Sequence, residues 1–118
     1  MEIIEQIRKY VLSKKFVEEC MPFDESTLVY KIGGKMFLLM SLDQEPLRIN
    51  VKTAPEHSEV LREEYPQITP GYHMNKKHWN SVVIDGYLSM QLIKELIDES
   101  FYLVVNKLPM KNRKELGL

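Results

Sequence analysis

The sequence has few of the features that mark specialised protein classes. Only one of its 118 residues, Cys20, is a cysteine, so the chain cannot form an internal disulfide, which favours a reducing compartment. No apolar run approaches the roughly 18 to 20 residues that a membrane-spanning helix needs. The start Met1-Glu2 lacks the basic region of a signal peptide. We therefore expect a cytoplasmic protein with no membrane contact.

The chain also lacks an excess of charge of either sign. Its formal net charge is −1, with 44% hydrophobic and 28% charged residues, which are ordinary values for one globular domain over residues 1–118. A near-neutral chain has no general attraction to nucleic acid. The charge is uneven, however, because the expected helices are acidic, whereas the expected strands, their loops and the C-terminal residues are basic. Solvated faces of mixed sign are the simplest explanation.

Catalytic and metal-binding motifs are missing as well. His73 and His78 are five residues apart, which puts them on opposite faces of a strand, and no cysteine or carboxylate completes a zinc pattern around them. Cys20 follows two glutamates and has no activating basic neighbour. Gly33-Gly34-Lys35 is too short for a phosphate-binding loop. We therefore expect no enzyme activity, no catalytic residue, no metal and no cofactor.

Two segments have the apolar spacing of amphipathic helices. Residues 3–11 and 89–108 carry apolar side chains every three or four positions, and Ser89 can cap the second helix. Between them, Thr53 and Glu56 fit a capping box that opens a short helix, with Val60, Leu61 and Tyr65 facing the core and Pro66 stopping it. The residues from 111 to 118 are expected to be a frayed tail.

Strand patterns fill much of the remaining sequence. Residues 27–32 and 35–42 are rich in β-formers and flank Gly33-Gly34, which predicts a two-residue hairpin turn. This register places Ile32 opposite Lys35, Lys31 opposite Met36 and Tyr30 opposite Phe37. Residues 47–52 alternate, with Leu47, Ile49 and Val51 inward and Arg48, Asn50 and Lys52 outward. This alternation implies that one face of the sheet is wet. Residues 72–84 carry further strand material around a polar centre.

The predicted order of elements is α-β-β-β-α-β-β-α. Hairpins without a βαβ repeat favour an α+β fold, with a single antiparallel sheet covered on one face by helices. The predicted core joins the sheet to the last helix through Leu47, Ile49, Val51, Ile93, Leu96, Ile97 and Phe101.

The polar run Asn75 to Asn80 is the most unusual segment. It contains adjacent lysines, amides and a histidine around Trp79 but no acidic residue, where a simple turn would more often carry Asp, Gly or Ser. A tryptophan is most often a core anchor. Basic and amide groups beside an aromatic ring are also what a phosphate-contacting loop uses.

Several blocks of the sequence together resemble the bacterial MmcQ/YjbR family. They are Pro22-Phe23, Leu28 to Phe37, Asn50 to Lys52, Pro70 to Asn80 and Asp85-Gly86, and they cover nearly the whole chain. Asp24, Tyr30 and Ile32 depart from the residues common in the family. The resemblance implies a CyaY-like fold and a DNA-binding protein with a double-wing motif. It does not imply iron binding, because a fold alone does not carry a site.

This resemblance gives the leading functional hypothesis, a non-enzymatic DNA-binding protein. The turn at Gly33-Gly34 and the loop Asn75 to His78 would be the two wings, contacting phosphates weakly and with low sequence specificity, since no arginine-rich recognition helix is visible. The DNA-binding residues would be Lys35, Asn75, Lys76, Lys77 and His78, with Lys31, Arg48 and Lys52 on the exposed sheet face.

Two rival functions remain open. The exposed sheet face with Arg48, Asn50 and Lys52 could dock an acidic protein, so that the chain is an interaction adaptor, which near-neutral net charge favours. A weaker alternative is a small-molecule site or an enzyme that uses His73, His78 and Trp79 at one pocket. A deep cavity beside those residues would favour the second rival.

Overall fold

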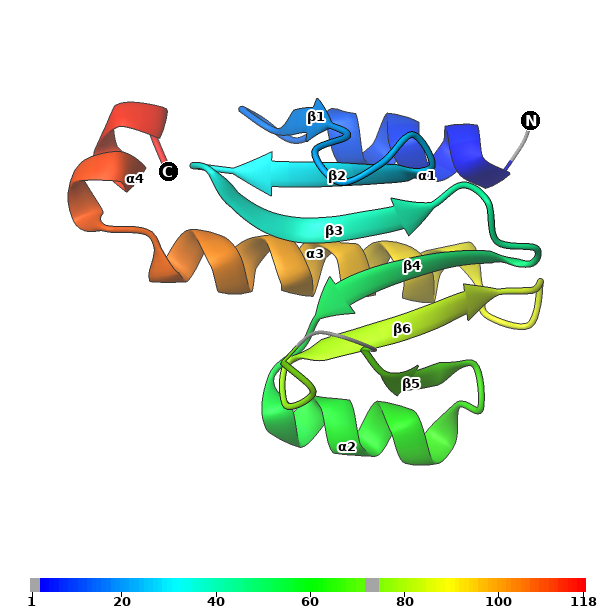
Figure 1. The fold of residues 1–118 in the computed structure, drawn as a ribbon. Coiled ribbons are helices and arrows are strands. Elements are labelled where there is room, and N and C mark those ends of the chain that lie inside the picture. Colours follow the sequence, from blue (N-terminus) through cyan, green and yellow to red (C-terminus); the bar gives the residue numbers. More distant parts are fainter. Residues whose placement is uncertain (1–2, 72–74) are drawn as a thin grey trace.

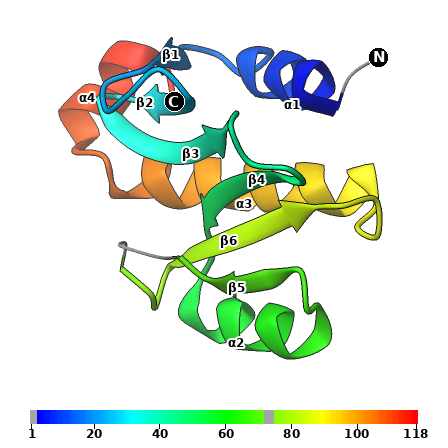
Figure 2. The same ribbon diagram turned by 45° about the vertical axis from the view of Figure 1, so that its right-hand side comes forward.

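The computed structural model describes residues 3–71 and 75–118. These residues form one antiparallel sheet of six strands in the order β1-β2-β3-β4-β6-β5. Helices α1 and α3 cover one face of the sheet, and α2 packs beside β5 at one edge (Figure 1, Figure 2). In chain order the elements are α1 (Ile3–Leu12), β1 (Glu18–Cys20), β2 (Thr27–Ile32), β3 (Lys35–Ser41), β4 (Leu47–Lys52), α2 (Pro55–Glu64), β5 (Ile68–Pro70), β6 (Trp79–Ile84), α3 (Met90–Lys107) and α4 (Met110–Leu116).

The predicted class, an α+β fold with a single antiparallel sheet, is confirmed, but the order of elements differs. Strand β1 was not predicted, and β5 lies before Gly71 rather than within residues 72–84. The expected frayed tail is helical instead. Helix α4 ends where Gly117 adopts the left-handed conformation with a φ of 72°, and its Leu116 packs against the core.

The hairpin between β2 and β3 follows the predicted turn. Both residues of Gly33-Gly34 have positive φ, and the two pairs nearest the turn are Ile32 with Lys35 and Lys31 with Met36, as predicted. The third predicted pair is wrong, because a bulge makes Tyr30 pair with Leu38. The bulge turns Phe37 toward the helices, where its ring meets Phe101 edge to face with centroids 5.3 Å apart.

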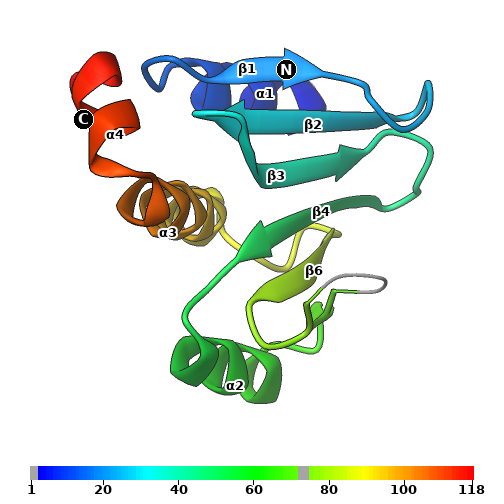
Figure 3. The ribbon, with the colours of Figure 1, turned by 60° about the vertical axis from the view of Figure 1, so that its left-hand side comes forward.

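The core lies between the sheet and the helices. All seven predicted core residues are buried in one cluster: Leu47, Ile49, Val51, Ile93, Leu96, Ile97 and Phe101. Helix α3 begins as predicted, with the Ser89 hydroxyl accepting a hydrogen bond from the Leu92 backbone N–H at 3.1 Å. Figure 3 looks nearly along α3 and shows it on one side of β3 and β4.

The opposite face of the sheet is only partly polar. Arg48, Asn50 and Lys52 point to this face, as the alternation in β4 predicts. A second, small apolar cluster lies beside them, formed by Val29, Leu39 and Trp79 with Cys20 and Met36. Trp79 is only 7% exposed, so it anchors this cluster.

The start of α2 differs from the prediction. Its N-cap is Ala54, which makes no side-chain cap, so Thr53 is not the cap of a capping box. The Thr53 hydroxyl instead hydrogen-bonds the buried side chains of Ser58 and Asn80. The helix ends before Pro66 as predicted. Leu61 is buried and Tyr65 packs against the core, but Val60 is 54% exposed because it lies on the solvent side.

Candidate functional site

Antiparallel pairing brings both predicted wings to the same end of the sheet. Strand β2 ends, β3 begins, β4 ends and β6 begins at this end. The Gly33-Gly34 turn and the loop of residues 75–78 therefore lie at one end, where α3 also finishes (Figure 1). We call it the basic end and define it by Gly33–Lys35, Lys52, Arg62, residues 75–79 and Lys107.

The basic end contains a cavity with three lysines in its wall. The cavity has a volume of about 310 Å³ and is lined by Lys35, Met36, Lys52, Trp79, Val104 and Lys107. The lysines come from β3, β4 and α3, and no carboxylate lies among the lining residues. Within the described part of the chain, none of the three lysines forms an ion pair. The cavity therefore presents uncompensated positive charge next to an apolar wall.

Lys52 is the most constrained of the three lysines. Its backbone N–H donates to the Ser100 hydroxyl at 2.8 Å, and its Nζ lies 5.7 Å from the centre of the Trp79 ring. Partial burial, and then the nearby positive charge of Lys107, lower the pKa of the Lys52 ammonium. An anion bound in the cavity would offset the repulsion between Lys52 and Lys107, and it would therefore oppose the part of this pKa shift that Lys107 causes.

The loop of residues 75–78 is held by its own backbone and by Arg62. The Asn75 side chain accepts a hydrogen bond from the Lys77 N–H at 3.0 Å, and the Asn75 carbonyl accepts from the Trp79 N–H at 2.8 Å. The guanidinium of Arg62 donates to the Lys76 carbonyl at 2.5 Å and to the Trp79 carbonyl at 3.1 Å. The side chains of Lys76 and Lys77 remain exposed. Asn75 thus shapes the loop, while the two lysines are available to a ligand.

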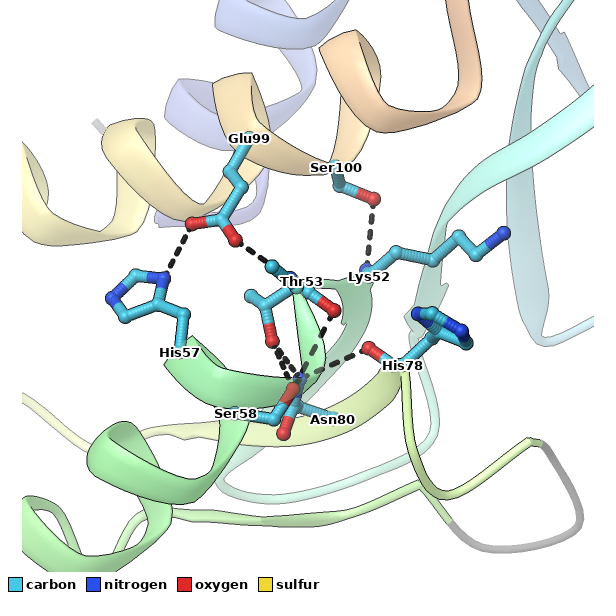
Figure 4. Close-up of polar contacts among 9 residues, drawn as sticks. Lys52, Thr53, His57, Ser58, His78, Asn80, Glu99 and Ser100 are labelled. Atoms are coloured by element: carbon cyan, nitrogen blue, oxygen red, sulfur yellow. Dashed lines mark hydrogen bonds and ion pairs between the residues drawn. The ribbon is translucent and has the colours of Figure 1, made fainter. Parts of the chain in front are cut away.

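A buried polar cluster lies next to the basic end and fixes the backbone there. The Asn80 amide donates to the Thr53 hydroxyl at 2.7 Å and to the carbonyl of His78 at 3.2 Å (Figure 4). Ser58 completes this group and is fully buried. Because these groups satisfy one another away from solvent, they connect β6 to α2 and present no accessible nucleophile.

A second set of contacts ties α2 to α3. Glu99 accepts hydrogen bonds from the Ala54 N–H at 2.9 Å and pairs with His57 Nδ1 at 2.6 Å. The Ser100 hydroxyl, one position further along α3, donates to the Phe37 carbonyl. Figure 4 shows the Lys52 side chain pointing away from all of these groups. The contacts fix the backbone at Lys52 and leave its ammonium to the cavity.

The structure separates some of the predicted residues from this site. Arg48 is four residues before Lys52 in β4, about 13 Å away along the strand, and is exposed on the outer face. Lys31 is directly opposite Glu18 of β1, which offsets its charge. The backbone carbonyl of His78 is used structurally, and its side chain is not among the lining residues of the cavity. His73 lies outside the described residues.

Two basic residues of this end, Lys107 and Arg62, were not predicted from the sequence. Lys107 is three positions after Val104, which the apolar stripe of the last helix already contained, and this spacing puts both on one helix face. Its position was therefore predictable once the hairpin was placed against that face. Arg62 could not be found in this way, because its role depends on long-range contacts to the loop of residues 75–78.

The described ranges 3–71 and 75–118 have the features of neither a metal-binding nor a membrane-spanning chain. In these ranges no group of three or more His, Cys, Asp or Glu side chains is arranged to hold a metal ion. None of the helices found there is both long enough and apolar enough to cross a membrane.

Comparison with known protein sequences gives consistent matches. A family model described as YjbR matches residues 12–103. The uncharacterized protein YbdF of Escherichia coli O157:H7 is 42% identical over 112 residues, which cover 95% of this chain and 92% of that protein. The uncharacterized protein YjbR of Escherichia coli strain K12 is 31% identical over 113 residues, which cover 96% of each protein.

Solved structures share the architecture as well. A crystal structure from Deinococcus radiodurans superposes with a TM-score of 0.93 at 41% sequence identity, covering 100% of this chain and 90% of that one. A crystal structure from Pseudomonas syringae gives a TM-score of 0.73 at 28% identity, covering 87% of this chain and 98% of that one. The six-stranded sheet with its flanking helices is therefore consistent with experimentally determined folds.

Proposed function

The chain belongs to the YjbR family, and we propose that it is a non-enzymatic protein that binds the phosphate backbone of duplex DNA through its basic end. The observation that carries this proposal is the convergence of Lys35, Lys52 and Lys107 around one cavity. The exposed Lys76 and Lys77 lie at the same end of the sheet. Backbone phosphates are the ligands that such a group of ammonium ions favours.

The arrangement supports contacts to phosphates rather than to bases. A lysine ammonium is a compact point charge, whereas discrimination between bases uses paired hydrogen bonds from groups such as guanidinium or amide. The arginine at this end, Arg62, donates to backbone carbonyls and to Asn80, so it is not free to read a base. Binding should therefore be weak, salt-dependent and nearly independent of sequence.

The test is a salt titration of duplex binding. With about three or four phosphates neutralised, the logarithm of the affinity should fall with the logarithm of salt concentration with a slope near −3 to −4. Replacing both Lys76 and Lys77 by Glu should weaken binding to every duplex and flatten that slope. The fold should survive, because the lysines are exposed. Fluorescence anisotropy with two unrelated duplexes measures both effects.

The adaptor function is the second candidate, and the position of Arg48 favours it. This arginine is exposed on the outer face, away from the basic end, and it forms no ion pair within the described residues. Arg48→Glu should leave duplex affinity nearly unchanged if DNA binds at the basic end. Duplex binding that is absent at low salt, or equal in the Lys76/Lys77 double variant, would contradict the DNA proposal. Loss of a protein partner on Arg48→Glu would then favour the adaptor.

A further inference from the structure

The cavity at the basic end has two different walls. Lys35, Lys52 and Lys107 form a cationic side, while Met36, Val104 and Trp79 form an apolar side. A wing that only touches an extended DNA backbone needs exposed charge and has no need of an apolar recess. The recess has the size of a small ligand site, at about 310 Å³. This combination suits a compact ligand with a charged group at one end and an apolar or aromatic group at the other.

The three ammonium groups define the charged group of that ligand. Three cations that line one cavity without a carboxylate repel one another, and a bound anion would relieve that repulsion. Lys52 is half-buried, whereas Lys35 and Lys107 are exposed. All three line the same cavity, so the charges border a recess rather than a flat surface. A terminal phosphate carries a charge of about −1.5 to −2 and three acceptor oxygens, and it therefore matches three lysines better than a single carboxylate does.

We propose that this cavity is a binding site for a terminal phosphate monoester with an attached ring, of the class of nucleoside 5′-monophosphates. Lys35, Lys52 and Lys107 contact the phosphate, and Met36, Val104 and Trp79 contact the organic part. The site shares Lys35, Lys52 and Lys107 with the proposed DNA-binding function but does not use Lys76 and Lys77. The same chemistry can come from a free mononucleotide or from the phosphorylated 5′ end of a DNA strand.

Trp79 makes the site directly measurable, because it is the chain's single tryptophan. Titration with deoxyadenosine 5′-monophosphate should change its fluorescence in a saturable way. Deoxyadenosine, which lacks the phosphate, should bind far more weakly. Lys107→Gln should reduce the affinity for the monophosphate about tenfold, the effect of losing one charge-assisted contact. Calorimetry gives the same affinities independently of fluorescence.

The matched control is Lys94→Gln. Lys94 lies on the same helix and is exposed, but it is outside the cavity, so this variant should bind the monophosphate like the wild type. Both substitutions are at exposed helix positions, and circular dichroism checks that each variant is folded. Absence of binding to the monophosphate, or equal affinities of the wild type and Lys107→Gln, would overturn the proposal.

Duplexes with different ends distinguish the source of the phosphate. Tighter binding of a 5′-phosphorylated duplex than of a 5′-hydroxyl duplex, lost in Lys107→Gln, identifies a DNA end as the ligand. Monophosphate binding without such a preference identifies a free mononucleotide. Binding of the 5′-hydroxyl duplex reports only on internal phosphates, so it separates failure of this site from failure of the DNA proposal.

Discussion

At the scale of single residues, Glu19 is at the centre of a network of hydrogen bonds and an ion pair. Its carboxylate accepts hydrogen bonds from Arg8 Nε at 2.8 Å and Nη2 at 2.9 Å, and from the Tyr30 hydroxyl at 2.7 Å. The bonds from Arg8 are the main reason that the pKa of Glu19 is lowered, and partial burial opposes them. Burial and the bond to Glu19 raise the pKa of Tyr30 well above its ordinary range. This network joins α1, β1 and β2.

The lowered pKa of Glu19 predicts a contribution to stability that depends on pH. Because the folded state favours the ionised form, the contribution is present above the ordinary pKa of 4.5 and is lost as pH falls through the lowered folded value. Glu19→Gln should lower the free energy of unfolding by about 1 kcal/mol at neutral pH. This is a small value for a hydrogen-bonded ion pair, because Arg8 is partly exposed. The stability of the Glu19→Gln variant should also fall less steeply than that of the wild type as the pH is lowered into the acid range. Urea unfolding of both proteins across acid pH measures this, and parallel curves would contradict it.

At the scale of elements, the hairpin turn is fitted to the end of α3. A Cβ on Gly33 would lie 2.8 Å from the Leu108 side chain, whereas a Cβ on Gly34 would meet nothing within 4 Å. Both glycines have positive φ, 59° and 80°. Leu108 follows Lys107 directly, so the same contact places the turn against the cavity wall.

These two glycines form a matched pair for a test of that contact. Gly33→Ala and Gly34→Ala both place an alanine at positive φ, which costs about 1 to 2 kcal/mol. Only Gly33→Ala also crowds Leu108, so it should destabilise the fold more and should weaken monophosphate binding by shifting Lys107. Thermal unfolding and Trp79 fluorescence titration measure the two effects. Equal stabilities of the variants would show that Leu108 gives way without cost.

Local sequence patterns were enough to predict several of these elements. The Gly33-Gly34 turn, the alternation of β4 and the cap at Ser89 are set by neighbouring residues, and all three predictions are confirmed. The predicted partner of Tyr30 and the predicted capping role of Thr53 were wrong. Both depend on residues far away in the sequence, since Phe37 packs on Phe101 and Thr53 hydrogen-bonds Asn80. The cavity was missed for the same reason, since Lys107 meets Lys52 only after α3 packs on the sheet.

At the scale of the whole molecule, the charge is unevenly distributed although the net charge is close to zero. The total of −1 gives no attraction to a polyanion, yet the lysines of the basic end converge, whereas Lys9 and Lys94 line a separate cavity near the start of α3. Lys107 is thirteen positions after Lys94, which is about 20 Å along the helix. That distance exceeds the screening length of about 8 Å at physiological salt. The two ends therefore act on a ligand independently.

This independence predicts that the position of a charge reversal matters more than its effect on net charge. Replacing Lys9 and Lys94 by Glu changes the net charge by the same amount as replacing Lys76 and Lys77, and all four side chains are exposed. Only the second variant should lose duplex affinity at physiological salt, because screening removes the distant repulsion. At low salt the first variant should weaken slightly, since the screening length grows. Anisotropy titrations at both salt concentrations decide this, and an equal loss in the two variants would mean that overall charge, rather than the basic end, governs binding.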